Sequence, residues 1–417
     1  MVDIHNFDYQ YRIAERQVLA SNISARNKNL IVGYRDACTL HGVCGKVRLI
    51  RVFHVLPRCA AILGKDFETV TREDVERLVT NLMDGKRKPA TIATYKSILR
   101  RFLGWVLRPT EFPRIKVQPP EIAWMTVHLK KRDEKRLQRT ELLTPSDIEA
   151  LLAVCHSPRD KALISMLWET GGRVSELGNL QLKHLTKHPH GFLLDVHGKT
   201  GHRNPLIISS APALATWLAH HPGAHNIESP LWVHYQYRGK TSAIDYDTIR
   251  MLLKRHFLRA NITKPYHPHL FRHSRATHVL AHGIMTDAQA RVYFGWSPES
   301  NMIGRYAHLT DVDAHNALLR ENHLLPVTPE TEHLQVKACQ RCKNMNVPTA
   351  THCTTCTLPL NAEVAYNETT QNEQLVLRLA KVLVEQGLME QPVQEIHKSN
   401  LAGCGKSAEF GKERLAS

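Results

Sequence analysis

The sequence predicts a mostly α-helical chain that carries a small antiparallel β-sheet in its central domain and a small metal-binding module behind it. Apolar residues recur at helical spacing from about residue 27 to residue 107, and again on both sides of residues 192–209. Within residues 192–209, two short apolar runs enclose a glycine-containing turn, which is typical of a β-hairpin. Two Cys-x-x-Cys pairs follow within residues 339–356, a spacing that favours a metal site over a disulfide framework.

The composition indicates several domains and an anionic partner. The 417 residues exceed what one core usually holds, so we expect two or three domains. Lys and Arg number 55 against 39 acidic residues, and the net charge of +16 favours nucleic acid, although a merely solvated basic surface has the same composition. No apolar stretch reaches the roughly 20 residues of a membrane span, and residues 1–27 lack the apolar core of a signal peptide. We therefore expect a cytoplasmic protein without membrane contact.

Residues 1–107 are expected to form a helical domain. One helix should begin at the capping pattern of Thr71 and Asp74, and a second, from about Thr91, should turn an apolar stripe inward. The second helix leaves three basic side chains outside, which are candidates for contacts to DNA phosphates or else a solvated face: Lys96, Arg100 and Arg101.

The next segment, residues 108–142, loses helical periodicity and contains several prolines, which indicates a linker between domains. It holds a basic run that could cross a DNA backbone or belong to an inert tether: Lys130, Lys131 and Arg132.

A second domain is expected over residues 143–326. It should open with a helix capped by Thr144. Residues 192–196 and 205–209 are two strand candidates on either side of a turn that holds Lys199. The helical pattern returns after this hairpin, so the domain should be mostly α with a small antiparallel sheet.

Five residues of this domain supply what metal-free cleavage of a phosphodiester requires: Arg173, His269, Arg272, Trp296 and Tyr306. Arg173 follows a Gly-Gly pair that should start a helix, where free backbone N–H groups bind anions. His269 and Arg272 are three residues apart on one helix face, so both can reach one phosphate. A tyrosine hydroxyl can attack phosphorus and stay attached. Each residue alone has an ordinary structural explanation, and the combination carries the prediction.

The sequence around these residues resembles that of the tyrosine recombinase, or phage integrase, family. The resembling motifs are Thr-Gly-Gly-Arg173-Val-Ser-Glu-Leu, His-Pro-His269-Leu-Phe-Arg272-His, and Gly-Trp296 followed ten residues later by Tyr306. The resemblance extends from about residue 27 to residue 326, and the motifs are most similar in sequence to those of archaeal members. It implies that residues 1–107 are a core-binding, SAM-like DNA-binding domain and that residues 143–326 are the α+β catalytic domain.

The resemblance also implies roles by position. Arg173 and the pair His269 and Arg272 would hold the phosphate. Tyr306 would be the nucleophile that forms a 3′-phosphotyrosyl bond, and Lys199 would be the general acid that protonates the leaving oxygen.

The chain departs from the family pattern at two places. Trp296 stands where most bacterial members have histidine, and its indole N–H can donate to a phosphate or simply pack, but it cannot shuttle a proton. The hairpin turn has His202 and Arg203 in place of a common second lysine. We expect Glu176 to orient an arginine or to pack nearby. Two further tyrosines compete for the role of nucleophile: Tyr266 and Tyr293.

The function implied is a site-specific DNA recombinase or integrase that needs neither ATP nor a catalytic metal. Its partner would be double-stranded DNA, with a tetramer on synapsed sites and a monomer or weak oligomer when free. Two alternatives stay open: DNA relaxation like that of a type IB topoisomerase, and a non-catalytic DNA-binding accessory protein.

A third block begins after the catalytic domain. Residues 331–362 resemble a zinc ribbon, whose four ligands would hold one structural Zn²⁺: Cys339, Cys342, Cys353 and Cys356. The block lacks the glycines that usually follow such Cys-x-x-Cys pairs. Residues 371–390 are expected to form an amphipathic helix that docks on its own protein or on a partner copy, and residues 391–417 a disordered tail.

Overall fold

The computed structural model describes residues 2–361, apart from residues 86, 128–136, 199–200, 235–241, 298, 301, 307–314, 316–317 and 320–334, together with scattered positions from 364 to 382. Within these residues the chain is mostly helical with small antiparallel sheets, as the sequence predicts. The basic run at Lys130, Lys131 and Arg132, the general-acid candidate Lys199 and the tail 391–417 lie outside the described residues.

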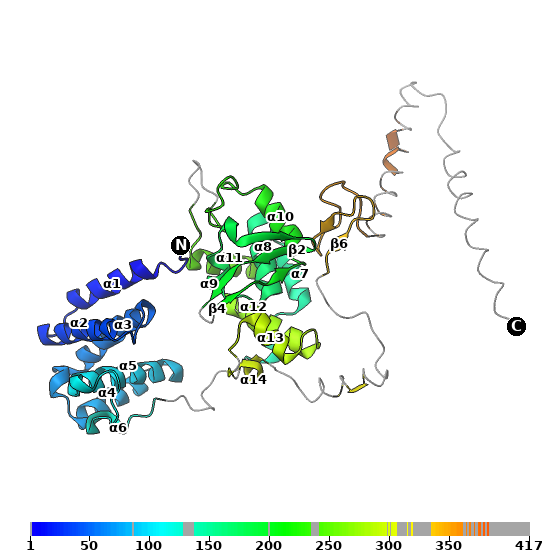
Figure 1. Ribbon diagram of the computed structural model, residues 1–417. Helices are drawn as coiled ribbons and strands as arrows, with labels where there is room; N and C mark the ends of the chain where they lie inside the picture. The colour runs from blue at the N-terminus through cyan, green and yellow to red at the C-terminus, as the bar shows by residue number, and fades with distance from the viewer. Residues whose placement is uncertain are drawn as a thin grey trace.

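The N-terminal helices form one body at the left of Figure 1. They are α1 Phe7–Ala20, α2 Ala25–Leu40, α3 Lys46–Leu63, α4 Arg72–Asp84, α5 Pro89–Leu107 and the short α6 Pro120–Ala123. Buried apolar side chains between residues 14 and 125 make one cluster. The predicted capping box is confirmed, because Thr71 and Asp74 bond each other's backbone N–H groups. Helix α1 lies before the start of the helical pattern that we expected near residue 27. Only Ala14 and Val18 of this helix are buried.

The second body is built around α8 (Pro158–Thr170), which is buried on nearly all sides. Helices α7 (Pro145–Ala153), α10 (Ala211–Ala219) and α12 (Pro268–Ala281) pack against it. The remaining helices are α9 Val174–Gly178, α11 Tyr246–Arg259, α13 Asp287–Phe294 and α14 Met302–Tyr306. Thr144 caps α7 as predicted. The boundaries assigned to the domains stay a prediction.

Five strands stand where the sequence predicted two. They are β1 Leu185–His188, β2 Gly191–Leu194, β3 Val196–Gly198, β4 Gly201–Arg203 and β5 Leu206–Ile207. The predicted strand 192–196 divides at Asp195, so that β2 lies between β1 and β5 while β3 pairs with β4. The predicted strand 205–209 ends early, because the backbone N–H groups of residues 208–210 all turn to the carboxylate of Glu169.

Strand β1 was missed for a simple reason. Its sequence, Leu-Thr-Lys-His, has exposed residues in the middle and no buried residue, so it lacks the apolar alternation that predicts a strand.

A short N-terminal segment ties the two bodies together. Ile4 is buried in the core of the second body, against Gly178 of α9. The backbone N–H of Ile4 donates to the side-chain oxygen of Asn179 at 3.0 Å, and its carbonyl accepts from the N–H of Tyr246 at 2.8 Å. The start of the chain therefore contacts the helix that follows Arg173.

Two C-terminal strands, β6 (Lys337–Ala338) and β7 (Met345–Asn346), form a hairpin beside α10 (Figure 1). The positions described between 371 and 382 are helical, but their apolar side chains at residues 375, 376, 379 and 382 are exposed. Among the residues described, no helix is both long and apolar enough to cross a membrane.

Candidate active site and DNA interface

Arg173 is held at the start of α9 by a buried carboxylate. Its backbone N–H donates to Oε2 of Glu176 at 3.0 Å, and its Nη1 donates to Oε1 at 2.5 Å. The second oxygen of Glu176 also accepts from Nη2 of Arg203 at 2.8 Å, and Arg203 donates further to the carbonyl of Tyr293 at 2.5 Å. Glu176 thus joins Arg173 to β4, and the expectation that it orients an arginine is confirmed.

Glu176 stays ionised in this position. Burial alone would raise the pKa of its carboxyl, but the charges and hydrogen bonds of Arg203 and Arg173 outweigh burial and hold the pKa below its usual value. Sequence reasoning noted Arg203 only as a departure from the family. No local pattern could show its role, because the two partners are 27 residues apart.

Arg272 is fixed by two backbone carbonyls, one at the end of α8 and one at the end of α13. Its Nη1 donates to the carbonyl of Gly171 at 3.0 Å and its Nη2 to the carbonyl of Phe294 at 2.7 Å. The guanidinium carbon lies 5.6 Å from the ring centre of Phe294 and 5.9 Å from that of Trp296. Gly171 has a φ of +51°, and a Cβ there would be 2.7 Å from the Phe294 ring, so only glycine fits. The ends of α8 and α13 are therefore clamped by one arginine that is 1% exposed.

Trp296 packs within this clamp. It is 6% exposed and stacks on Phe294 with ring centres 5.0 Å apart. The packing role left open by the sequence is thus observed, and a contact of its indole with phosphate stays a prediction.

His269 stands at the first turn of α12, where the positive end of the helix favours an anion. The residue is exposed to solvent in the described structure. Partial burial lowers the pKa of His269 to about 4, and the charges of Arg272 and Arg173 act in the same direction. The imidazole is therefore neutral near pH 7 and can either donate or accept a hydrogen bond.

The backbone brings Tyr306 toward these groups, at the end of α14. This helix packs on α12, and its residues Met302 and Ile303 lie against the cluster that includes Trp296. The side chain of Tyr306 is outside the described parts of the structure. Its nearer rival is occupied: the hydroxyl of Tyr293 donates to the carbonyl of Glu169 at 3.0 Å, and burial raises the pKa of Tyr293 to about 12.

The other rival, Tyr266, packs half-buried against the main core of the second body. Lys199 lies outside the described residues. The paired strands β3 and β4 on either side of it are described, and Gly198 pairs with Gly201 at the turn. Below the turn, Arg203 anchors the hairpin to Glu176.

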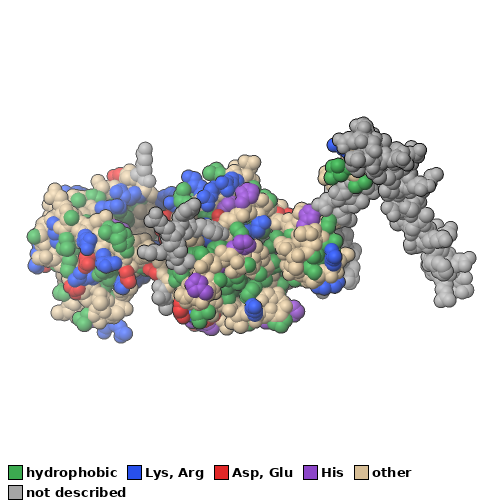
Figure 2. Space-filling model, turned by 90° about the horizontal axis from the view of Figure 1, so that it is seen from above, with side chains coloured by type: hydrophobic (Ala, Val, Ile, Leu, Met, Phe, Trp, Pro, Cys, Tyr) green, Lys and Arg blue, Asp and Glu red, His purple; other side chains and the backbone are tan. Residues whose placement is uncertain are grey.

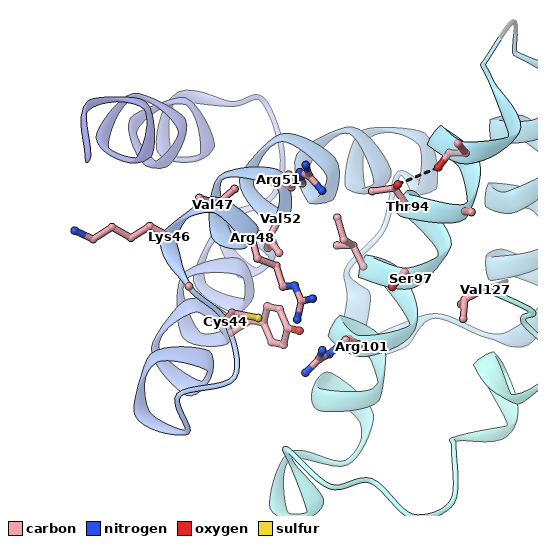
Figure 3. Close-up of a pocket in the computed structure, with 15 residues that line it drawn as sticks. Cys44, Lys46, Val47, Arg48, Arg51, Val52, Thr94, Ser97, Arg101 and Val127 are labelled. Atoms are coloured by element: carbon pink, nitrogen blue, oxygen red, sulfur yellow. Dashed lines mark hydrogen bonds between the residues drawn. The ribbon is translucent and has the colours of Figure 1, made fainter. Parts of the chain in front are cut away.

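A basic groove runs between α3 and α5 of the N-terminal body. It has a volume of about 810 Å³, and its lining includes Arg48 and Arg51 of α3 and Arg101 of α5. Figure 3 shows Arg48 and Arg101 reaching toward each other across it, whereas Lys46 points away. Of the three basic residues predicted on α5, only Arg101 lines this groove.

The other two behave differently. Arg100 donates to the carbonyl of Met125 at 3.1 Å and borders a smaller adjacent groove, and Lys96 is in the lining of neither. Sequence reasoning missed Arg48 and Arg51, although their spacing of three residues on one helix was a usable signal. Figure 2 shows Lys and Arg side chains on the surfaces of both bodies.

The four C-terminal cysteines converge into what we call the four-cysteine cluster. The sulfurs of Cys339 and Cys356 are 3.5 Å apart and those of Cys342 and Cys353 3.4 Å, with all four within 4.8 Å of one another. Four thiolates about 2.3 Å from one Zn²⁺ would stand roughly 3.8 Å apart, so the cluster fits a tetrahedral ion.

The missing glycines do not prevent the turns. Lys343 and Thr357, each just after a Cys-x-x-Cys pair, adopt φ of +59°. Their backbone N–H groups donate to the carbonyls of Cys339 and Cys353, both at 2.9 Å. Buried Asn346 links the two halves, since it donates to the carbonyl of residue 337 and accepts from the N–H of residue 354.

Comparison with known proteins identifies the family. The profile of the phage integrase family matches residues 141–312. A tyrosine recombinase of Thermosipho africanus is 26% identical over 234 residues, which cover 53% of this chain and 75% of the relative. The tyrosine recombinase XerD of Halalkalibacterium halodurans is 30% identical over 229 residues, which cover 51% of this chain and 70% of the relative.

The fold agrees with this assignment. The solved post-cleavage complex of XerH site-specific recombinase with palindromic difH substrate matches with a TM-score of 0.52 at 15% identity, covering 75% of this chain and 95% of XerH. The chain belongs to the tyrosine recombinase, or phage integrase, family and is an enzyme that breaks and rejoins DNA strands.

Proposed function

We propose that this site-specific recombinase cuts and rejoins DNA through a 3′-phosphotyrosyl bond to Tyr306. The observation that carries the proposal is the clamp at the end of α8, where Arg272 bonds the carbonyl of Gly171 and Arg173 follows two residues later. Both guanidinium groups are fixed by separate partners before any substrate binds. Such preorganised cations can stabilise the charge that develops on phosphorus-bound oxygens.

The chemistry follows from the residue types. The Tyr306 hydroxyl releases its proton to solvent as its oxygen attacks phosphorus, the bond to the 5′ oxygen breaks, and Lys199 gives that oxygen a proton. Neutral His269 supplies a hydrogen bond without adding a charge. Attack by a 5′ hydroxyl on the phosphotyrosine reverses the steps, so rejoining needs no ATP because the phosphodiester energy is kept in the covalent bond.

We assign binding of the DNA duplex to the basic groove of the N-terminal body. Arg48, Arg51 and Arg101 come from two helices and face one space, which suits a phosphate backbone better than scattered surface charges. The run at Lys130, Lys131 and Arg132 is proposed to cross the duplex between the two bodies. The protein would act in the cytoplasm, as a tetramer on two synapsed sites and a monomer or weak oligomer when free.

The test of this function compares two reactions of one preparation. A recombinase should exchange strands between two copies of its site and release little relaxed product from a supercoiled plasmid that lacks the site. Relaxation of any supercoiled plasmid without strand exchange would instead establish the type IB topoisomerase alternative. Absence of both reactions, together with DNA binding, would establish the accessory protein.

The four-cysteine cluster is proposed to hold one structural Zn²⁺ through Cys339, Cys342, Cys353 and Cys356. The closed ligand set leaves no position for a substrate, so the ion would stabilise the ribbon and take no part in cleavage.

We therefore expect one zinc per chain that survives dialysis, and its loss in Cys339→Ser, because three thiolates hold the ion less tightly. Elemental analysis measures the zinc, and Cys155→Ser, a buried cysteine of the main core, is the matched control. Cleavage of one strand should persist after chelation. Zinc retained by Cys339→Ser, or cleavage that stops on chelation and returns with metal, would contradict the assignment.

A further inference from the structure

The outer face of the β3–β4 hairpin carries three metal-ligating side chains. Val196 pairs with Arg203 and His197 pairs with His202 across the two strands. Val196 is fully buried and the Arg203 side chain is 10% exposed, so this pair faces inward. Because side chains alternate along a strand, His197 and His202 face outward together, and Asp195, two residues before His197, shares their face.

Asp195, His197 and His202, which we call the outer triad, already converge. Oδ1 of Asp195 is 3.1 Å from Nε2 of His197 and 2.5 Å from Nε2 of His202. The imidazole centres are 4.8 Å apart, and the three ligand atoms lie within 4.8 Å of one another. Ligand atoms about 2.1 Å from one ion stand roughly 3 to 3.5 Å apart, so only small side-chain movements are needed to seat an ion.

The contacts between these side chains bring the right donor atoms to one point. Two imidazoles direct their Nε2 atoms at the same carboxylate oxygen, so two nitrogen ligands and one anionic oxygen ligand face a common position. The side chains are 44% to 67% exposed, so an ion can enter without any opening of the fold and can keep water on its remaining positions.

We propose that the outer triad binds a divalent transition metal such as Zn²⁺ or Ni²⁺, through two imidazole nitrogens and one carboxylate oxygen. Two nitrogen ligands favour these ions over Mg²⁺ and Ca²⁺, which prefer oxygen. The site is separate from the four-cysteine cluster and differs from it in having no sulfur ligand.

An ion here restrains the turn that holds Lys199. The pair His197 and His202 is followed by one more residue pair, Gly198 with Gly201, before that turn. The inner face of the hairpin is already tied to Glu176 through Arg203. A metal on the outer face fixes the hairpin from its second side. This consequence for Lys199 rests on the proposed catalytic role, whereas metal binding itself does not.

The test uses the full chain with its four-cysteine cluster already filled with zinc. Calorimetric titration with Ni²⁺ should show one further site per chain. Removal of one ligand in His202→Asn should weaken this site by more than about 10-fold, since loss of even an outer partner of a metal ligand costs about 10–100-fold. Hydrogen exchange of residues 195–203 should slow on addition of Ni²⁺ in the parent chain and stay unchanged in the variant.

The matched control removes two other histidines of the neighbouring hairpin, half-buried His188 and exposed His190. Their rings are 5.6 Å apart, but no carboxylate joins them in a ligand group among the described residues. The double variant His188→Asn and His190→Asn should keep the Ni²⁺ site. Absence of a further site in the parent, retention of it in His202→Asn, or loss of it in the control would each overturn the proposal. Strand cleavage is not part of this readout, so an inactive preparation decides the metal site equally well.

Discussion

Tyr306→Phe should bind DNA like the parent chain and form no covalent complex on a duplex that carries a nick next to the cleavage site. The substitution removes one oxygen, the atom that we expect to bond phosphorus, and leaves the rest of α14 unchanged. A nick traps the covalent product because the short leaving strand diffuses away before rejoining. The measurement is a denaturing gel, where an adduct appears as a slowly migrating band.

The control for this result is Tyr293→Phe. The hydroxyl of Tyr293 donates to the carbonyl of Glu169, so its loss should cost about 1 kcal/mol of stability and leave adduct formation intact. An adduct that persists in Tyr306→Phe and disappears in Tyr293→Phe would transfer the nucleophile to Tyr293. Adducts in both variants would place it on a third residue.

The sequence predicted the parts of the site that are local in the chain. The Gly-Gly before Arg173 predicted a helix start, and α9 begins there at Val174. The spacing of His269 and Arg272 predicted one helix face, and α12 contains both. Helix starts and i to i+3 spacing depend on neighbours in the sequence, so a single chain is enough to show them.

The supports of the site could not be predicted in this way. Arg203 meets Glu176 only because β4 folds back beside α9. The carboxylate of Glu169 ends β5 by binding backbone N–H groups about 40 residues later. Ile4 packs against Gly178, although the whole N-terminal domain separates the two residues in the sequence. Each of these contacts joins polar or apolar groups that many other residues of the same type could have satisfied, and only the assembled fold selects the pair.

The basic groove shows the same limit on a smaller scale. Helical periodicity correctly put Arg101 on the outer side of α5. The pattern could not say which outer residues face α3, and so it did not separate Arg101 from Lys96. That distinction depends on the angle between two helices, which the packing of their buried faces sets.

Arg272→Lys should be the most damaging of the substitutions that conserve charge. A lysine keeps the positive charge but has one nitrogen in place of a planar fork, so it cannot reach both Gly171 and Phe294. A buried carbonyl left without its donor costs about 1–3 kcal/mol, which should lower the free energy of unfolding. Loss of a preorganised donor to the phosphate should lower the rate of cleavage by about 10²-fold or more.

Arg173→Lys separates these two effects. The side chain of Arg173 is 28% exposed and bonds Glu176 at one nitrogen, a contact that lysine can reproduce. We therefore expect Arg173→Lys to lose cleavage to a similar extent while its free energy of unfolding stays close to that of the parent. Single-turnover cleavage of the nicked duplex and denaturant unfolding measure the two quantities on the same proteins. If Arg272→Lys unfolds like the parent and cleaves at the parent rate, the guanidinium clamp between α8 and α13 holds neither the fold nor the phosphate, and the assignment of the active site to this junction is wrong.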